Sequence, residues 1–236
     1  MQGPDFDRPT AEVIEQLSRA GTATLQGILK RMGVRRVWMP LYPLKSGMKC
    51  VGPALTIRSV PGREDLTPIA YAPETAFPGH PDDAIDAIQP GDVVVLDGRG
   101  VTDEGLFGDL LTLRMKTQGA AGSVSDMGVR DSSRILKTGL PTFSRGPCSP
   151  GGSVYNVDFN VPIGCAGVLV CPGDVISADD DGTIEYQSGD YQFYTLAADD
   201  GCLDGALEAL FMPEGPDAEH AFEYPIYVAG LDELPA

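Results

Sequence analysis

The chain has few cations for its length and no long hydrophobic run. Its 236 residues include 17 Lys and Arg against 34 Asp and Glu, which gives a formal net charge of -17. Because phosphate backbones and anionic lipid surfaces repel such a chain, we expect neither nucleic acid nor a membrane as its partner. No apolar run approaches the ~18 residues of a membrane span. The first residues lack the basic stretch and apolar core of a secretory signal, so we expect a cytoplasmic protein.

The usual signals of nucleophilic catalysis are also missing. The five cysteines are odd in number and form no CxxC pair, which indicates free thiols. There is no GxSxG motif, and no lysine lies in a clearly apolar strand, which argues against a Schiff base. His80 and His220 lie in irregular, turn-rich segments.

What the chain does have is an interleaved pattern of helices and short strands. The helices are predicted over residues 10–17, 22–32, 82–88, 109–117, 132–137 and 194–211. The strands are predicted over residues 52–59, 93–97, 122–126, 141–144, 174–177 and 183–186, with two more inside 161–170, broken by Gly164 and Gly167. This order favours a layered α/β fold. No break in composition divides the chain, so we expect residues 1–236 to form a single domain.

The most informative run extends from Gly108 to Asp131 and reads GDLLTLRMKTQGAAGSVSDMGVRD. A predicted helix, a glycine turn and a short predicted strand separate Asp109 from Arg130 and Asp131, an order that can return the pair to the start of the helix. Two carboxylates and a guanidinium in one cleft could hold a divalent cation and an anionic substrate. On spacing alone, Asp109 could instead be a helix cap, with Arg130 and Asp131 a surface pair.

Several ordered motifs make the chain resemble the RraA-like family, which includes the 4-hydroxy-4-methyl-2-oxoglutarate (4-carboxy-4-hydroxy-2-oxoadipate) aldolases. The motifs are GDVVVLDG at 91–98, GAAGSVSDMGVRD at 119–131, GLPTFSRG at 139–146 and NVPIGCAGVLVCPGDVISADDDG at 160–182. The resemblance covers a core of about residues 10–200, whereas the C-terminal tail is divergent.

The resemblance implies roles for the residues of the informative run. Asp131 would be the direct ligand of a divalent metal, Mg²⁺ or Mn²⁺, and Asp109 would hold metal-bound water. Arg130 would bind and stabilise the substrate oxygen. The family's backbone amides that grip the pyruvyl carboxylate fall here at Gly108, Leu110 and Leu111.

The resemblance also implies a fold, an assembly and a reaction. The fold would be a three-layer β/β/α domain of the swivelling type with N-terminal helices. The assembly would be a homotrimer or hexamer with active sites at subunit boundaries. The reaction would be the class II, metal-dependent cleavage of a 4-hydroxy-2-oxo diacid to pyruvate and a second oxo-acid. Oxaloacetate decarboxylation would use the same enolate. The missing nucleophile signals are consistent with such metal-assisted chemistry.

The chain departs from the family pattern in ways that affect the substrate pocket. Asp109 stands where the family commonly has Glu, and Leu113 and Arg114 could reshape or charge the pocket. The family's aldolases also use an acid donated by a neighbouring subunit near the C-terminus. Four residues of the divergent tail are candidates for it: Glu208, Glu214, Glu219 and Glu223.

Two alternative functions remain open at this point. Some members of the family regulate an RNA-degrading enzyme by binding it without chemistry, and a strongly acidic chain suits docking to a basic partner. The retention of Asp109 favours catalysis. The other alternative is a metal-dependent lyase or hydratase that acts on another hydroxy or sugar acid.

Two further acidic clusters are predicted to be structural. Asp82 and Asp83 follow His80 at the expected start of a helix, where carboxylates bind free backbone N–H groups. The run 179–182, DDDG, lacks the terminal bidentate acid of an EF-hand and is typical of a tight turn between strands.

Overall fold

The computed structural model describes residues 2–31, 34, 36–63, 81–151, 153–186, 191–195 and 209–213. Five helices lie in these ranges: α1 (Ala11–Arg19), α2 (Thr22–Arg31), α3 (Pro81–Asp86), α4 (Asp109–Gln118) and α5 (Ser132–Thr138). The strands of the first half are β1 (Trp38–Met39), β2 (Tyr42–Pro43), β3 (Cys50–Pro61), β4 (Val93–Leu96), β5 (Gly105–Phe107), β6 (Gly122–Ser125) and β7 (Gly128–Val129). Those of the second half are β8 (Thr142–Ser144), β9 (Val154–Phe159), β10 (Ile163–Cys165), β11 (Val168–Val170), β12 (Val175–Asp179), β13 (Gly182–Tyr186), β14 (Tyr191–Thr195) and β15 (Ala209–Pro213).

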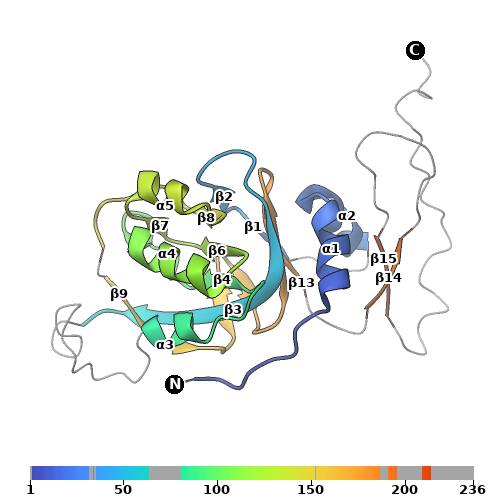
Figure 1. Ribbon diagram of the computed structural model, residues 1–236, viewed down its shortest axis with the longest axis horizontal. Helices are drawn as coiled ribbons and strands as arrows, with labels where there is room; N and C mark the ends of the chain where they lie inside the picture. Colours follow the sequence, from blue (N-terminus) through green and yellow to red (C-terminus); the bar gives the residue numbers. More distant parts are fainter. Residues whose placement is uncertain are drawn as a thin grey trace, which may run out of the picture.

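One curled sheet organises the molecule, in the order β1-β13-β12-β3-β4-β6-β8-β2, with β9 pairing β3. Strands β3, β4, β6 and β8 pair in parallel, whereas β12 and β9 pair antiparallel to β3 at its two ends. The long strand β3 therefore links the parallel part of the sheet to the antiparallel part. Helices α3, α4 and α5 lie together on one side of the parallel part (Figure 1). The predicted mixed α/β fold with N-terminal helices is confirmed.

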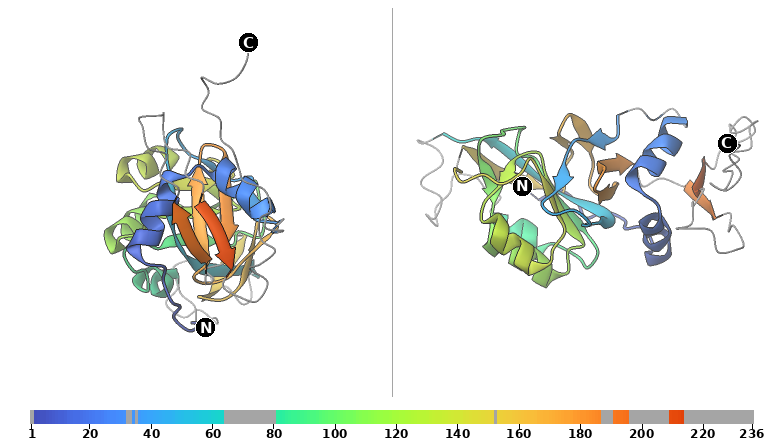
Figure 2. Two further views of the ribbon diagram at one scale, coloured as in Figure 1. Left: turned by 90° about the vertical axis from the view of Figure 1, so that its right-hand side faces the viewer. Right: turned by 90° about the horizontal axis from the view of Figure 1, so that it is seen from above.

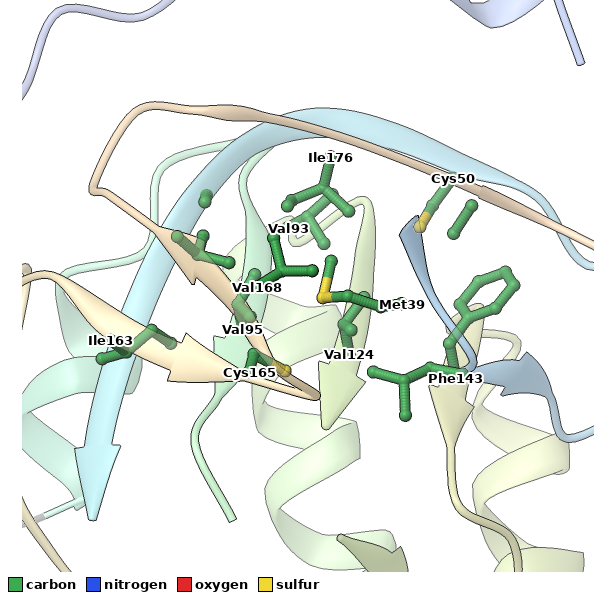
Figure 3. Close-up of a cluster of buried hydrophobic side chains, with 14 residues drawn as sticks. Met39, Cys50, Val93, Val95, Val124, Phe143, Ile163, Cys165, Val168 and Ile176 are labelled. Atoms are coloured by element: carbon green, nitrogen blue, oxygen red, sulfur yellow. The ribbon is translucent and has the colours of Figure 1, made fainter. Parts of the chain in front are cut away.

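The parallel strands are buried on both faces, which explains their continuous apolar sequence. Val94 and Leu96 of β4 belong to the core beneath α3, α4 and α5. Val93 and Val95, which alternate with them, belong to a second core (Figure 3) that also contains Ile163 and Val168 of the β10–β11 hairpin. Side chains that point to opposite faces of one strand thus join a helical layer and a β layer to the same sheet.

The two N-terminal helices pack on the antiparallel part of the sheet, away from α3–α5 (Figures 1 and 2). Leu17, Leu25 and Leu29 share a third core with Ile184 and Tyr186 of β13. The predicted cap Thr10 accepts a hydrogen bond from the Val13 N–H group at the start of α1. The apolar faces of α1 and α2 are therefore buried against this end of the sheet.

Several predicted elements need correction. The helix predicted over 194–211 is wrong at both ends, because Thr195 lies in β14 and Ala209 in β15. The aromatic and β-branched residues of YQFYT favour a strand over a helix. Gly164 lies within β10, and the hairpin turns instead at Ala166 and Gly167. The short strands β1, β2, β5 and β7 were not predicted, since strands of two or three residues show no periodicity. The six-residue strand β9 was not predicted either.

The 179–182 turn does lie between strands, as predicted, and it also ties distant segments together. The Asp179 carboxylate accepts hydrogen bonds from the Thr22 N–H and hydroxyl groups, at 2.8 and 2.5 Å, and so anchors the start of α2. The Asp180 carboxylate accepts from the Ser46 hydroxyl and the Gly47 N–H group. Asp86, on the helix α3 that follows His80, pairs with Arg114, whereas His80 itself lies outside the described residues.

A buried carboxyl pair at the start of the β12–β13 hairpin predicts a pH-dependent stability. Burial and the neighbouring Asp174 raise the pKa of Glu185 to about 8, and the protonated Glu185 donates a hydrogen bond to Asp174. The unfolded chain releases this proton near pH 4.5, so the free energy of unfolding should fall as the pH rises from about 4.5 to about 8. Replacing Glu185→Gln should flatten this slope in urea titrations, whereas the exposed-site control Glu15→Gln should keep it. An unchanged slope in Glu185→Gln would refute the assignment.

Candidate active site

The run that starts at Gly108 folds back on itself through two short parallel strands. In the β5–β7 pairing, Gly105 lies opposite Gly128 and Phe107 opposite Val129. The Arg130 N–H group then donates to the Phe107 carbonyl oxygen at 2.8 Å. Since Gly108 follows β5 and Arg130 follows β7, this pairing places Arg130 and Asp131 beside the start of α4.

Asp131 lies against Gly108, and no side-chain hydrogen bond or ion pair with another described residue engages its carboxylate. A Cβ atom at Gly108 would lie 2.9 Å from Asp131 Oδ2, so a side chain there would occupy the space the carboxylate uses. Asp131 precedes α5 with φ 53°, in the left-handed region, and makes no side-chain capping hydrogen bond. A non-glycine residue in this region is typical of functional sites. Its exposed carboxylate is therefore available to a ligand.

The aliphatic stem of Arg130 lies close to two glycines. A Cβ atom at Gly105 would lie 2.6 Å from Arg130 Cγ, and one at Gly151 would lie 3.4 Å from Arg130 Cδ. These two glycines therefore let the arginine stem lie between β5 and the loop before β9. Arg130 forms no ion pair with any residue that the structure describes, and the residue as a whole is exposed.

An open pocket of about 370 Å³ adjoins these groups. Most of its lining residues are polar or charged, and the full set is Val129, Arg130, Asp131, Ser132, Ser133, Pro147, Cys148 and Ser149. The N–H group of Cys148 donates to the Val129 carbonyl oxygen at 2.8 Å, which fixes the loop wall to β7. The sequence did not single out Cys148 or the serines, because no motif marks them.

Asp109 opens α4, as predicted, but it has a partner that we did not predict. The Asp109 Oδ2 atom lies 3.4 Å from Nη1 of Arg134 on α5. The Arg134 side chain is 71% exposed and that of Asp109 is 21% exposed. No sequence signal points to Arg134, because its contact with Asp109 joins two different helices.

The start of α4 offers backbone donors near these side chains. Gly108 is the N-cap and has no side chain to bond the first turn, so the N–H groups of Leu110 and Leu111 lack an intrahelical acceptor. Leu110 is 78% exposed, whereas Leu111 packs against the core beneath α3–α5. Arg114, which we considered as a pocket cation, instead pairs with Asp86 of α3 at 2.5 Å.

Among the described residues, no group of three or more His, Cys, Asp or Glu side chains is placed to hold a metal ion. A magnesium ion needs fewer protein ligands, since it usually keeps several waters and binds one or two carboxylates. The four glutamates considered as donated acids lie outside the described residues. No described helix is long and apolar enough to cross a bilayer.

Comparison with known proteins gives one consistent relationship. A family model described as RraA-like, Aldolase/RraA, matches residues 10–184. A Halalkalibacterium halodurans protein named "Putative 4-hydroxy-4-methyl-2-oxoglutarate aldolase" is 30% identical over 158 residues, which are 66% of this chain and 69% of that protein. Protein DlpA of Legionella pneumophila is 32% identical over 174 residues, but these are 73% of this chain and only 27% of DlpA.

A solved structure shares the fold over most of both chains. Streptomyces coelicolor RraAS2, described as an unusual member of the RNase ES inhibitor RraA protein family, superposes with a TM-score of 0.67. It is 31% identical, and the match covers 78% of this chain and 88% of that one. The relatives thus include proteins named for catalysis and proteins named for inhibition.

Proposed function

The chain belongs to the RraA-like family, and we propose that it is a divalent-metal-dependent lyase that cleaves a 4-hydroxy-2-oxo diacid to pyruvate and a second oxo-acid. One observation supports this proposal above the others. The Asp131 carboxylate, which makes no capping hydrogen bond, and the Cβ atom of Arg130 both lie beside Gly108, where α4 begins. Oxaloacetate decarboxylation, which passes through the same enolate, is a second expected activity.

The residues present suit a hard divalent cation. Asp131 would bind Mg²⁺ or Mn²⁺ directly, since its carboxylate oxygens are hard donors and no capping bond engages them. Asp109 would hold a metal-bound water. The cation supplies Lewis-acid stabilisation of negative charge that develops on the 2-oxo group.

The chain's own groups account for substrate binding and proton transfer. The N–H groups of Leu110 and Leu111 would bind the carboxylate next to the oxo group, as free amides at a helix start do. Arg130 would donate hydrogen bonds to the substrate oxygen on which charge develops, and Gly105 and Gly151 leave the space that its stem occupies. Asp109 would direct the water that accepts the proton of the 4-hydroxyl group.

The direct test of the proposed function uses metal-stripped protein. After treatment with EDTA, the protein should release pyruvate from oxaloacetate and from 4-hydroxy-4-methyl-2-oxoglutarate only when Mg²⁺ or Mn²⁺ is restored. Pyruvate release is followed with a coupled NADH-dependent dehydrogenase. If neither substrate yields pyruvate above the metal-only background, the proposed lyase activity is wrong.

A second candidate function is inhibition of an RNA-degrading endonuclease, which the likeness to Streptomyces coelicolor RraAS2 favours. In that case the net charge of -17 would promote docking to a basic partner. The two functions separate experimentally, because Asp131→Asn should strongly lower pyruvate release while leaving endonuclease inhibition intact. A lyase or hydratase for another hydroxy or sugar acid would show metal-dependent turnover of that acid but not of the oxo diacids.

We also propose that the protein forms a homotrimer or hexamer whose active sites lie at subunit boundaries. The exposed side chains of Leu110 and Leu113 on α4, at 78% and 51%, are consistent with an apolar contact beside the pocket.

A further inference from the structure

We propose that Arg134 determines specificity for diacids by binding the far carboxylate of the substrate. This inference rests on the proposed function, because it assigns the second end of the substrate in the same site. Arg134 lies on α5 one turn beyond Arg130, and its neighbour Ser133 lines the pocket. Its Nη1 atom already lies 3.4 Å from a carboxylate oxygen of Asp109.

The Arg134–Asp109 contact is too weak and too exposed to serve mainly as a stabilising ion pair. Exposed pairs contribute about 0–1 kcal/mol, and this one is long and 71% exposed on the arginine side. A guanidinium carries five N–H donors in a planar fork. A single contact at 3.4 Å leaves most of that fork available to a second carboxylate.

Charge balance points to the same residue. A diacid brings two negative charges to a site that already contains Asp109 and Asp131. A divalent cation and Arg130 would offset three of these four charges. Among the residues described as lining the pocket, Arg130 is the only cation, Asp131 is an anion, and the others carry neutral hydroxyl, thiol or apolar side chains. Arg134 supplies the fourth positive charge, in a protein whose net charge of -17 adds a further repulsion against anions.

Inert analogues test this assignment without turnover. 2-Oxoglutarate has no 4-hydroxyl group, so retro-aldol cleavage does not apply to it, and 2-oxopentanoate has the same chain length without the second carboxylate. In calorimetric titrations with Mg²⁺, the wild-type protein should bind 2-oxoglutarate about tenfold more tightly than 2-oxopentanoate, the size expected for one charge-assisted contact. Arg134→Gln should abolish this preference, and Arg134→Lys should keep part of it.

Lys137→Gln provides the matched control. Lys137 is an exposed cation on the same helix, three residues farther from the pocket, so its removal changes the net charge equally. It should leave the preference for the diacid unchanged. Thermal unfolding of each variant checks the fold, which Arg134 hardly supports because its side chain is largely in solvent.

The outcomes separate this inference from the proposed function. If Arg134→Gln keeps the preference, or weakens both ligands equally, Arg134 does not recognise the far carboxylate. If the wild-type protein shows no preference, the inference also falls. If the wild-type protein releases no pyruvate, the proposed lyase activity is wrong. The binding preference would still show whether Arg134 recognises the far carboxylate.

Discussion

Replacing Asp131→Asn is expected to lower kcat/KM for oxaloacetate decarboxylation about 1,000-fold, equivalent to about 4 kcal/mol of transition-state stabilisation. Asparagine has nearly the same shape and tolerates the left-handed conformation that Asp131 adopts, at φ 53°. It lacks the negative charge that a divalent cation requires. The Tm should stay within a degree or two of wild type, since Asp131 is exposed and makes no capping bond.

Two measurements complete this experiment. Mn²⁺ titration by electron paramagnetic resonance should show a strong loss of affinity in Asp131→Asn, whether or not the chosen substrate is the natural one. Asp181→Asn is the control, because it removes the same charge from an exposed turn between β12 and β13. Wild-type Mn²⁺ affinity together with wild-type activity in Asp131→Asn would show that this carboxylate is not the metal ligand.

The sequence predicted the long elements well because their patterns are strong. Helix α4 starts at Asp109, and Gly119 caps its end in the left-handed conformation, where the sequence placed both signals. Strand β4 is a continuous apolar run between turns, which is typical of a parallel strand buried on both faces. These features depend on neighbours in the chain, so local patterns are sufficient to predict them.

The parts of the site that the sequence did not predict depend on contacts between distant segments. Gly151 reaches the Arg130 stem through a loop that has no periodic signal. Arg134 meets Asp109 because α4 and α5 lie side by side (Figure 1), and helix packing of this kind is not encoded in spacing along the chain. The polar pocket wall likewise forms when the loop carrying Cys148 bonds to β7.

The largest stability effect that we expect comes from the N-terminal segment, and it too depends on a contact between residues far apart in the chain. Asp92 is fully buried, and Arg8 binds both of its carboxylate oxygens, at 2.8 and 3.0 Å. The Gln89 N–H group donates a third hydrogen bond at 2.9 Å. The bond to Asp92 raises the pKa of Arg8. The sequence indicated only a turn at Asp92, because its partner lies 84 residues away.

Replacing Arg8→Met should therefore lower the free energy of unfolding by about 3 kcal/mol, since it leaves a buried carboxylate without its cation. We expect the lower end of the usual range because about a fifth of the Arg8 side chain remains in water. In a protein of this size the Tm should fall by roughly 10 °C. Methionine keeps the length and much of the apolar stem, so the change reports mainly on the lost charge and hydrogen bonds.

Arg19→Met is the matched control, because Arg19 pairs with Glu15 at the same 2.8 Å distance but with both side chains more than half exposed. An exposed pair of this type contributes about 0.3–0.5 kcal/mol, so its loss should hardly change the Tm. The double variant Arg8→Met with Asp92→Asn should recover part of the stability, since a neutral amide is less costly to bury than an unpaired charge. If Arg8→Met and Arg19→Met have equal Tm values, the buried Arg8–Asp92 pair contributes no more to stability than the exposed Arg19–Glu15 pair. The N-terminal segment would then be held by its other contacts.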